Sequence, residues 1–226
     1  FGIEVVSHIV QIGSVKSDFS SELTAEAVRE KAAQSLVSCI CETASTEMIA
    51  LIDNAKRRGD TLGGVFEVVV FGLPIGLGSY VHWDERIDGR IGQAILSINA
   101  VKGVEIGLGF GVAALPGSQV HDEFAVDDTG HVLRPSNRAG GPEGGITNGQ
   151  PLVVRGAMKP IATLMRQLGS VNLQTGQAAP AFAERSDVCA VPAAGVIAEA
   201  MVAIVLMEAF LEKFGGDSMA EIQRNY

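Results

Sequence analysis

The chain has 226 residues, of which 47% are hydrophobic and 19% charged, and its formal net charge is −9. This composition excludes intrinsic disorder and allows a sizeable core in one large domain or two small ones. The negative charge disfavours a role in nucleic-acid binding, because phosphate backbones attract basic surfaces.

The cysteines and the apolar stretches indicate neither a zinc site nor a membrane span. The longest apolar stretch, residues 188–207, contains Pro192 and Glu199, and a charge near mid-span is costly in a bilayer. We therefore expect a buried amphipathic helix there. An odd number of cysteines without a secretory segment or a C-x-x-C pair fits free thiols in a reducing compartment: Cys39, Cys41 and Cys189.

The first third of the chain predicts two strands and two helices. Residues 1–12 resemble a strand with imperfect alternation of apolar and polar residues, in which His8 is more easily explained as a sheet residue than as a ligand. Residues 45–58 form the clearest helix, because apolar residues recur at helical spacing. Residues 20–37 predict a further helix, and residues 65–71 a strand.

The middle of the chain contains two histidine clusters. His82-Trp83-Asp84 suits either a general base oriented by a carboxylate or a polar cluster at a helix start, and we favour the second. His121-Asp122-Glu123 does not predict a metal site, because adjacent strand residues point to opposite faces.

Residues 87–101 predict a helix and residues 104–111 a glycine-punctuated strand. That strand lacks the dinucleotide-binding fingerprint G-x-G-x-x-G, because Val112 stands where the third glycine would fall. Residues 127–130 form a predicted turn between two strands.

The segment 134–163 has the composition of an anion-binding loop. Its glycines let the backbone approach a ligand closely, Asn148-Gly149 predicts a tight hairpin turn, and Arg155 and Lys159 supply cations. The alternative is a surface loop beside an edge strand.

The last part of the chain pairs a cation with a carboxylate before a long helix. Arg185 and Asp187 point the same way if the segment is extended, which places them on one side of a pocket or makes them a surface ion pair. Residues 190–214 predict the longest helix, ended by Gly215-Gly216, and residues 217–226 a short one. Together the elements indicate an α+β fold with antiparallel sheets.

Several long motifs resemble those of the chorismate synthase family. They are SNRAGG-x-x-GG-x-T-x-G-Q followed by R-x-x-x-KP-x-x-T, SYVHWDERID (79–88), SINAVKGVEIG (97–107), GSQVHDE (117–123) and RSDVCAVPAAGVIAEAMVAIVL (185–206). The resemblance implies a helical layer sandwiched between antiparallel β-sheets, and a homo-oligomer, expected to be a tetramer. The family has a further N-terminal region that nothing here matches, so residues 1–226 resemble a single domain forming the C-terminal portion of the larger fold.

The resemblance also implies an activity. Chorismate synthases are lyases of the shikimate pathway, and so of aromatic amino acid biosynthesis. They convert 5-enolpyruvylshikimate 3-phosphate to chorismate and phosphate by an anti-1,4-elimination that requires reduced FMN. NADPH and a cytoplasmic location are implied too, and no metal is.

The family's functional positions carry over onto this sequence residue by residue. The implied catalytic residue is Asp187, which with Arg185 also contacts the substrate. The implied flavin contacts are Asn99, Ala100, Gly144, Lys159, Pro160, Ile161, Ala162, Thr163 and Arg185.

This sequence departs from the family in two ways. The family's two catalytic histidines belong to its N-terminal region, so the 226-residue chain alone is expected to be inactive. Ser186 also occupies the place where R-x-D often carries histidine. Two hypotheses follow: a chorismate synthase recorded without its N-terminal region, or a non-catalytic domain that retains flavin binding and oligomerisation.

Overall fold

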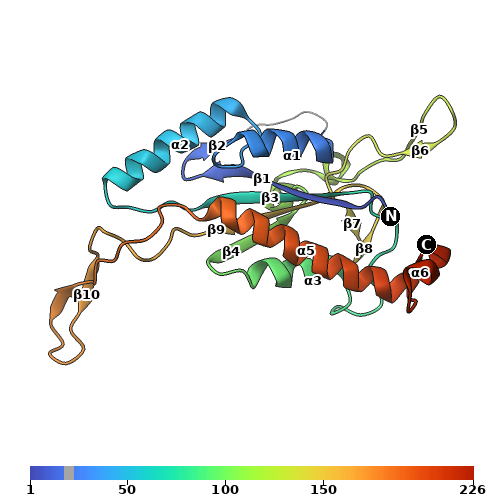
Figure 1. Cartoon of the computed structure of the whole chain (residues 1–226). Coiled ribbons are helices and arrows are strands. Elements are labelled where there is room, and N and C mark those ends of the chain that lie inside the picture. Colours follow the sequence, from blue (N-terminus) through green and yellow to red (C-terminus); the bar gives the residue numbers. More distant parts are fainter. Residues whose placement is uncertain (18–22) are drawn as a thin grey trace.

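A five-stranded antiparallel sheet organises the computed structural model, which describes residues 1–17 and 23–226 (Figure 1). Its strand order is β2-β1-β3-β9-β4, and β9 lies between β3 and β4. The bounds of the strands are β1 Glu4–Ile12, β2 Val15–Lys16, β3 Gly64–Phe71, β4 Val101–Ile106 and β9 Leu152–Met158.

Helices cover both faces of this sheet. On β3, Phe66 and Val68 point into the larger hydrophobic cluster, to which the long helix α5 (Val191–Phe214) and α3 (Ile87–Leu96) contribute. Val69 follows Val68, so its side chain points to the other face of the sheet, where it packs with helix α1 (Ala25–Gln34). Helix α2 (Glu42–Arg57) covers the β2 edge, and α6 (Met219–Asn225) follows α5.

Helix α5 is buried along one face only. The buried side packs on β1 and β3, whereas the other side exposes an apolar stripe of Val196, Ile197, Ile204, Met207 and Leu211. In the part of the chain that the structure describes, α5 is also the one helix long and apolar enough to cross a membrane by length and composition. One face of α5 is thus buried, but the expectation of a mostly buried helix is not met on the other face.

The α+β class and the antiparallel sheet are confirmed. Among the described residues the helical layer that contains α5 has a large sheet on one side.

Small two-stranded ribbons extend from this body. The hairpin β5–β6 (Ala125–Val126 and Val132–Leu133) confirms the predicted turn at 127–130. The hairpin β10–β11 (Gly169–Val171 and Ala178–Pro180) projects from the opposite end of the molecule (Figure 1). Between β4 and β5 lie the 3-10 helix η1 (Gly109–Ala114) and the short helix α4 (Gly117–Val120).

Two predicted elements have different bounds in the structure. The helix predicted at 87–101 ends at Leu96, because Ala100 has a positive φ of 67° and Val101 already pairs with β9. The strand predicted at 104–111 is wrong beyond Ile106, because Gly107 takes a positive φ and the chain continues into η1. Helix α1 begins after Thr24, so residues 20–22 of the helix predicted at 20–37 lie outside the described residues.

The prediction of a tight hairpin turn at Asn148-Gly149 is wrong, because the two-residue hairpin loop is Gly144-Gly145. Gly144 and Gly145, with φ of 63° and 97°, join β7 (Pro142–Glu143) to β8 (Ile146–Thr147). Two consecutive positive φ angles are what a two-residue hairpin loop of type I′ requires, and glycine adopts them without strain. Asn148-Gly149 instead connects β8 to β9, which belong to different sheets.

Strand β9 packs so closely at Gly156 that one added methyl group is expected to lower the stability of the fold. A Cβ at Gly156 would overlap the ring of the fully buried Phe66, whereas a Cβ at Gly103 would meet Ala157 at an ordinary 3.6 Å. We expect Gly156→Ala to lower the free energy of unfolding by about 1–3 kcal/mol, as overpacked cores do. Urea denaturation of both variants checks this, and equal stability of Gly156→Ala and Gly103→Ala would contradict it.

Candidate functional site

Three segments that are distant in sequence meet at one end of the sheet. They are the turn after α2 (residues 59–63), the stretch after β9 (159–166) and the stretch before α5 (184–189). Three hydrogen bonds join them: Leu62 N to Val188 O (2.7 Å), Thr61 Oγ1 to Ile161 O (2.7 Å) and Arg166 N to Gly59 O (3.0 Å). The backbone therefore fixes the relative positions of the segments.

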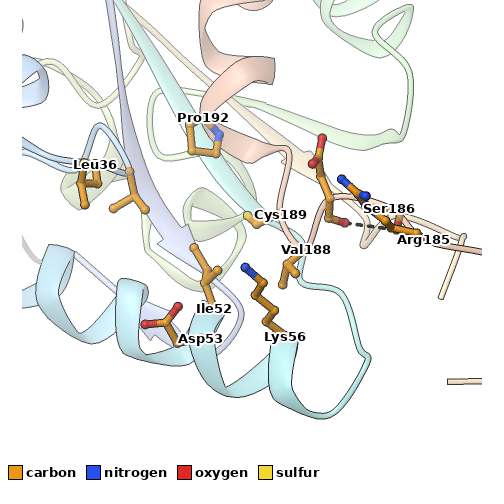
Figure 2. A pocket seen from close by; sticks show the side chains of 11 residues that line it. Leu36, Ile52, Asp53, Lys56, Arg185, Ser186, Val188, Cys189 and Pro192 are labelled. Atoms are coloured by element: carbon orange, nitrogen blue, oxygen red, sulfur yellow. Dashed lines mark hydrogen bonds between the residues drawn. The ribbon is translucent and has the colours of Figure 1, made fainter. Parts of the chain in front are cut away.

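A cavity of about 430 Å³ opens between α2 and the stretch before α5 (Figure 2). Its charged lining residues are Asp53 and Lys56 from α2, and Arg185 and Asp187 from the opposite wall. Its volume falls within the range of about 300–1,000 Å³ that is typical of small-molecule sites. A second cavity of about 260 Å³ adjoins it, and Lys56 and Arg185 line both.

Arg185 and Asp187 share this cavity, which is one of the two arrangements that their spacing left open. Within residues 1–17 and 23–226, neither side chain forms an ion pair or a hydrogen bond, so the pair is not the surface ion pair of the alternative interpretation. Ser186 lies between them and donates a hydrogen bond from Oγ to the carbonyl oxygen of Thr163 at 2.6 Å. This bond holds the R-S-D segment against the end of the 159–163 stretch.

Asn99 and Ala100 lie at the same end of the sheet. The amide of Lys159 donates to the carbonyl of Ala100 at 2.9 Å, and Val101 pairs with Met158. Asn99 and Ala100 thus lie beside the end of β9, and neither lines the cavity. The structure places together Asn99, Ala100, Lys159, Pro160, Ile161, Ala162, Thr163, Arg185 and Asp187.

Gly144 lies apart from this group. Its hairpin contacts the start of α3, where the amide of Ile87 donates to the carbonyl of Gly145 at 2.9 Å. The seven residues of β9 separate it from Lys159. A strand of this length spans about 20 Å at roughly 3.3 Å per residue. Within one chain, Gly144 is therefore not brought together with the other implied flavin positions.

Arg155 does not belong to the site, which corrects the expectation that it serves as an anion-binding cation. It lies within β9, and its Nε donates to Glu67 Oε2 at 2.6 Å. The buried His8 hydrogen bonds to the other oxygen of Glu67 at 3.0 Å, so His8 is a sheet residue as predicted. Burial raises the pKa of Glu67, but the hydrogen bond with His8 and the charge of Arg155 outweigh it, and the pKa is lowered.

Asp122 has a structural role that the sequence did not reveal. Its carboxylate accepts hydrogen bonds from Ser136 Oγ (2.5 Å), Arg138 N (2.8 Å) and Ala139 N (2.9 Å). Burial raises the pKa of Asp122, but these bonds and the charge of Arg138 outweigh it and lower the pKa. Asp122 thus anchors the SNRA turn before the glycine loop. The described residues include no cluster of three potential metal ligands.

His82-Trp83-Asp84 lies in an exposed turn before α3. The side chains of His82 and Asp84 are not hydrogen bonded to one another in the part of the chain that the structure describes. The interpretation as a polar cluster before a helix agrees with this placement.

The fold is of the α+β class with an antiparallel sheet, and within residues 1–17 and 23–226 its open cavity holds an arginine and a carboxylate that are both unpaired. The family model for chorismate synthase matches residues 1–211. The chain belongs to the chorismate synthase family.

Individual relatives agree with this assignment. A chorismate synthase of Solibacter usitatus is 55% identical over 230 residues, covering 100% of this chain and 58% of the relative. One of Geobacter metallireducens is 53% identical, covering 100% and 59%. A crystal structure of chorismate synthase superposes with a TM-score of 0.82 at 45% identity, covering 99% of this chain and 61% of that one. The chain thus spans about three-fifths of the length of these relatives.

The His8–Glu67–Arg155 network predicts acid-sensitive stability. Because the folded pKa of Glu67 is lowered, its contribution is present above its ordinary value of 4.5 and is lost as the pH falls through the folded pKa. We expect Glu67→Gln to lower the free energy of unfolding by about 1–3 kcal/mol near neutral pH and to flatten its decline in acid. Urea unfolding across the acid range tests this. The exposed Glu47→Gln in α2 is the control, and an unchanged acid dependence in Glu67→Gln would contradict the prediction.

Proposed function

We propose that the protein containing this chain is a chorismate synthase, which eliminates phosphate from 5-enolpyruvylshikimate 3-phosphate with reduced FMN as cofactor. The observation that supports this most directly is the meeting of Arg185 and Asp187 in one cavity of a chain that belongs to the family. In the proposal, residues 1–226 form a single domain and the C-terminal portion of the fold.

The residues present fit an anionic flavin. The cavity has the volume of a small-molecule site, and Arg185 is a cation without a partner among the described residues. The implied contacts Lys159 and Thr163 are exposed beside it, so their backbone and side chains are accessible to a ligand. When bound, reduced FMN supplies electron density that stabilises charge developing during the elimination.

The side chains of the cavity have distinct roles in this proposal. Arg185 binds a phosphate or carboxylate group through its planar fork of N–H donors. Asp187 accepts the proton that the substrate loses, while phosphate leaves with the electron pair of the broken C–O bond. Ser186 positions both by its hydrogen bond to Thr163. Such fixed charges act most strongly where water is excluded.

The rest of the catalytic apparatus belongs to the additional length of the family. The two family histidines are assigned to none of the histidines here, which are His8, His82, His121 and His131. We further propose a homotetramer in the cytoplasm, supplied with reducing equivalents by NADPH. The exposed apolar stripe of α5 supports a large additional packing surface, because contiguous apolar patches mark interaction sites.

Asp187 provides the first test of this function. We expect Asp187→Asn in the intact protein to preserve the fold and FMN binding but to slow turnover by about 10²–10⁴-fold, because an amide cannot accept the proton. Steady-state chorismate formation with reduced FMN measures this. Asp53→Asn, which removes another carboxylate of the same cavity, is the control. Unchanged turnover in Asp187→Asn would remove this residue from proton transfer.

Arg185 provides the second test. We expect Arg185→Ala to weaken binding of FMN or of the substrate by roughly 10-fold or more, because it leaves an anion without its bidentate partner. Titration of FMN and the substrate KM distinguish the two ligands. Arg166→Ala is the matched control, since Arg166 is exposed on the neighbouring stretch and lines neither cavity. Equal behaviour of the two variants would exclude Arg185 from the site.

A further inference from the structure

Lys56 faces the cavity from a helix that the implied site does not include. It lies in the last turn of α2, where Ile52, Asp53 and Lys56 line the cavity together. Positions three and four apart share one helix face, so Ile52 and Lys56, with Asp53 beside them, project to the same side of α2. Figure 2 shows the amino group of Lys56 pointing from α2 toward the strand-like stretch that carries Val188 and Cys189.

The position of Lys56 is fixed by the segments that form the rest of the site. The chain turns at Gly59 and Asp60, three and four residues after it, and the next residues bond to both site segments. Thr61 reaches Ile161 on one side, and Leu62 bonds to Val188 on the other. These bonds hold the end of α2 against the other two segments. The backbone of Lys56 is therefore held beside the cavity.

Lys56 and Arg185 line this cavity without a direct ion-pair partner among the described residues. In the described part of the chain, Lys56 and Arg185 take part in no ion pair, although Asp53 and Asp187 share their cavity. Three arginines elsewhere in the structure are paired: Arg90 with Glu208 and Glu212, Arg134 with Glu143, and Arg155 with Glu67. Among the described residues the exposed Arg57, Arg58 and Arg166 also lack an ion pair, but none of them lines the larger cavity. Lys56 and Arg185 also line the adjoining cavity, so both flank the place where the two cavities meet.

A cation at a helix C-terminus is stabilised by the helix dipole, which by itself explains a lysine at this position. The same explanation applies to Arg57, the next residue, which is exposed and lines neither cavity. Lys56 and Arg57 thus differ in that only Lys56 lines a cavity. A variant of Arg57 separates a general charge effect from a contact with the ligand.

We propose that Lys56 is a second anion-binding residue of this site, acting with Arg185 on a phosphate or carboxylate group of the ligand. Arginine binds such a group through a rigid fork, whereas the lysine ammonium adds a mobile point charge from the opposite wall. The proposal rests on the proposed function, which identifies the anion as the phosphate of FMN or a phosphate or carboxylate of the substrate.

The test uses Lys56→Met, Lys56→Arg and the control Arg57→Met in the intact protein. The affinity for FMN and for riboflavin, which lacks the phosphate, is measured by flavin titration. The KM for 5-enolpyruvylshikimate 3-phosphate is measured at saturating reduced FMN. We expect Lys56→Met to weaken one of these ligands by about 10-fold or more, as loss of a charged hydrogen bond does. Lys56→Arg should recover part of the loss, and Arg57→Met should behave as the unmodified protein.

The outcomes separate the possible anions and the two proposals. Weaker FMN binding with unchanged riboflavin binding assigns Lys56 to the flavin phosphate, and a raised KM alone assigns it to the substrate. Normal binding of both ligands by Lys56→Met, or the same loss in Arg57→Met, overturns the role of Lys56 while the proposed function stands. An unmodified protein that binds neither FMN nor the substrate overturns the proposed function and this proposal with it.

Discussion

The antiparallel pairing of β9 between β3 and β4 is the constraint on which the rest of the structure depends. Pairing with β4 brings Lys159 to Ala100, and pairing with β3 brings the turn after α2 beside Ile161. Since a shift by one residue would turn every side chain of β9 to the other face, the register also sets which residues are buried. Gly156 packs beneath the buried ring of Phe66 and opposes such a shift. The site is thus a consequence of one strand register.

The spacing of apolar residues predicted the longest elements well, because this spacing depends directly on which face of the element is buried. The helices expected at 45–58 and 190–214 appear as α2 and α5, within a few residues of those bounds. Predictions that depended on glycine or on charge were less successful. Gly107 ends β4, and Asn148-Gly149 joins strands of different sheets, because the partner of a strand is chosen by tertiary contacts. The sequence suggested that Arg155 binds an anionic ligand. Its guanidinium instead donates a hydrogen bond to Glu67, which is 88 residues away in sequence.

The resemblance to the family supplied the residues of the candidate site, and the fold showed where they lie. Sequence spacing left Arg185 and Asp187 as either a pocket pair or a surface ion pair, and in the structure both line the cavity. No spacing rule connects Lys56 to Arg185, or Asp122 to the SNRA turn, because those contacts exist only after distant segments have folded together. The separation of Gly144 from the other implied flavin positions was likewise invisible in the sequence, where Gly144 and Lys159 are only 15 positions apart. In the structure the extended strand β9 lies between them.

Residues 164–184, which carry the projecting hairpin β10–β11, connect the two halves of the site. The base of this segment is closed by the bond from Ser186 to Thr163 and by the bond from the amide of Glu184 to the carbonyl of Leu164. The distance between the two halves in space is therefore set at the base and does not depend on the length of chain in the hairpin. Because exposed loop tips tolerate insertions and loop closure costs grow slowly with length, the hairpin can lengthen, shorten or change sequence while the site keeps its dimensions.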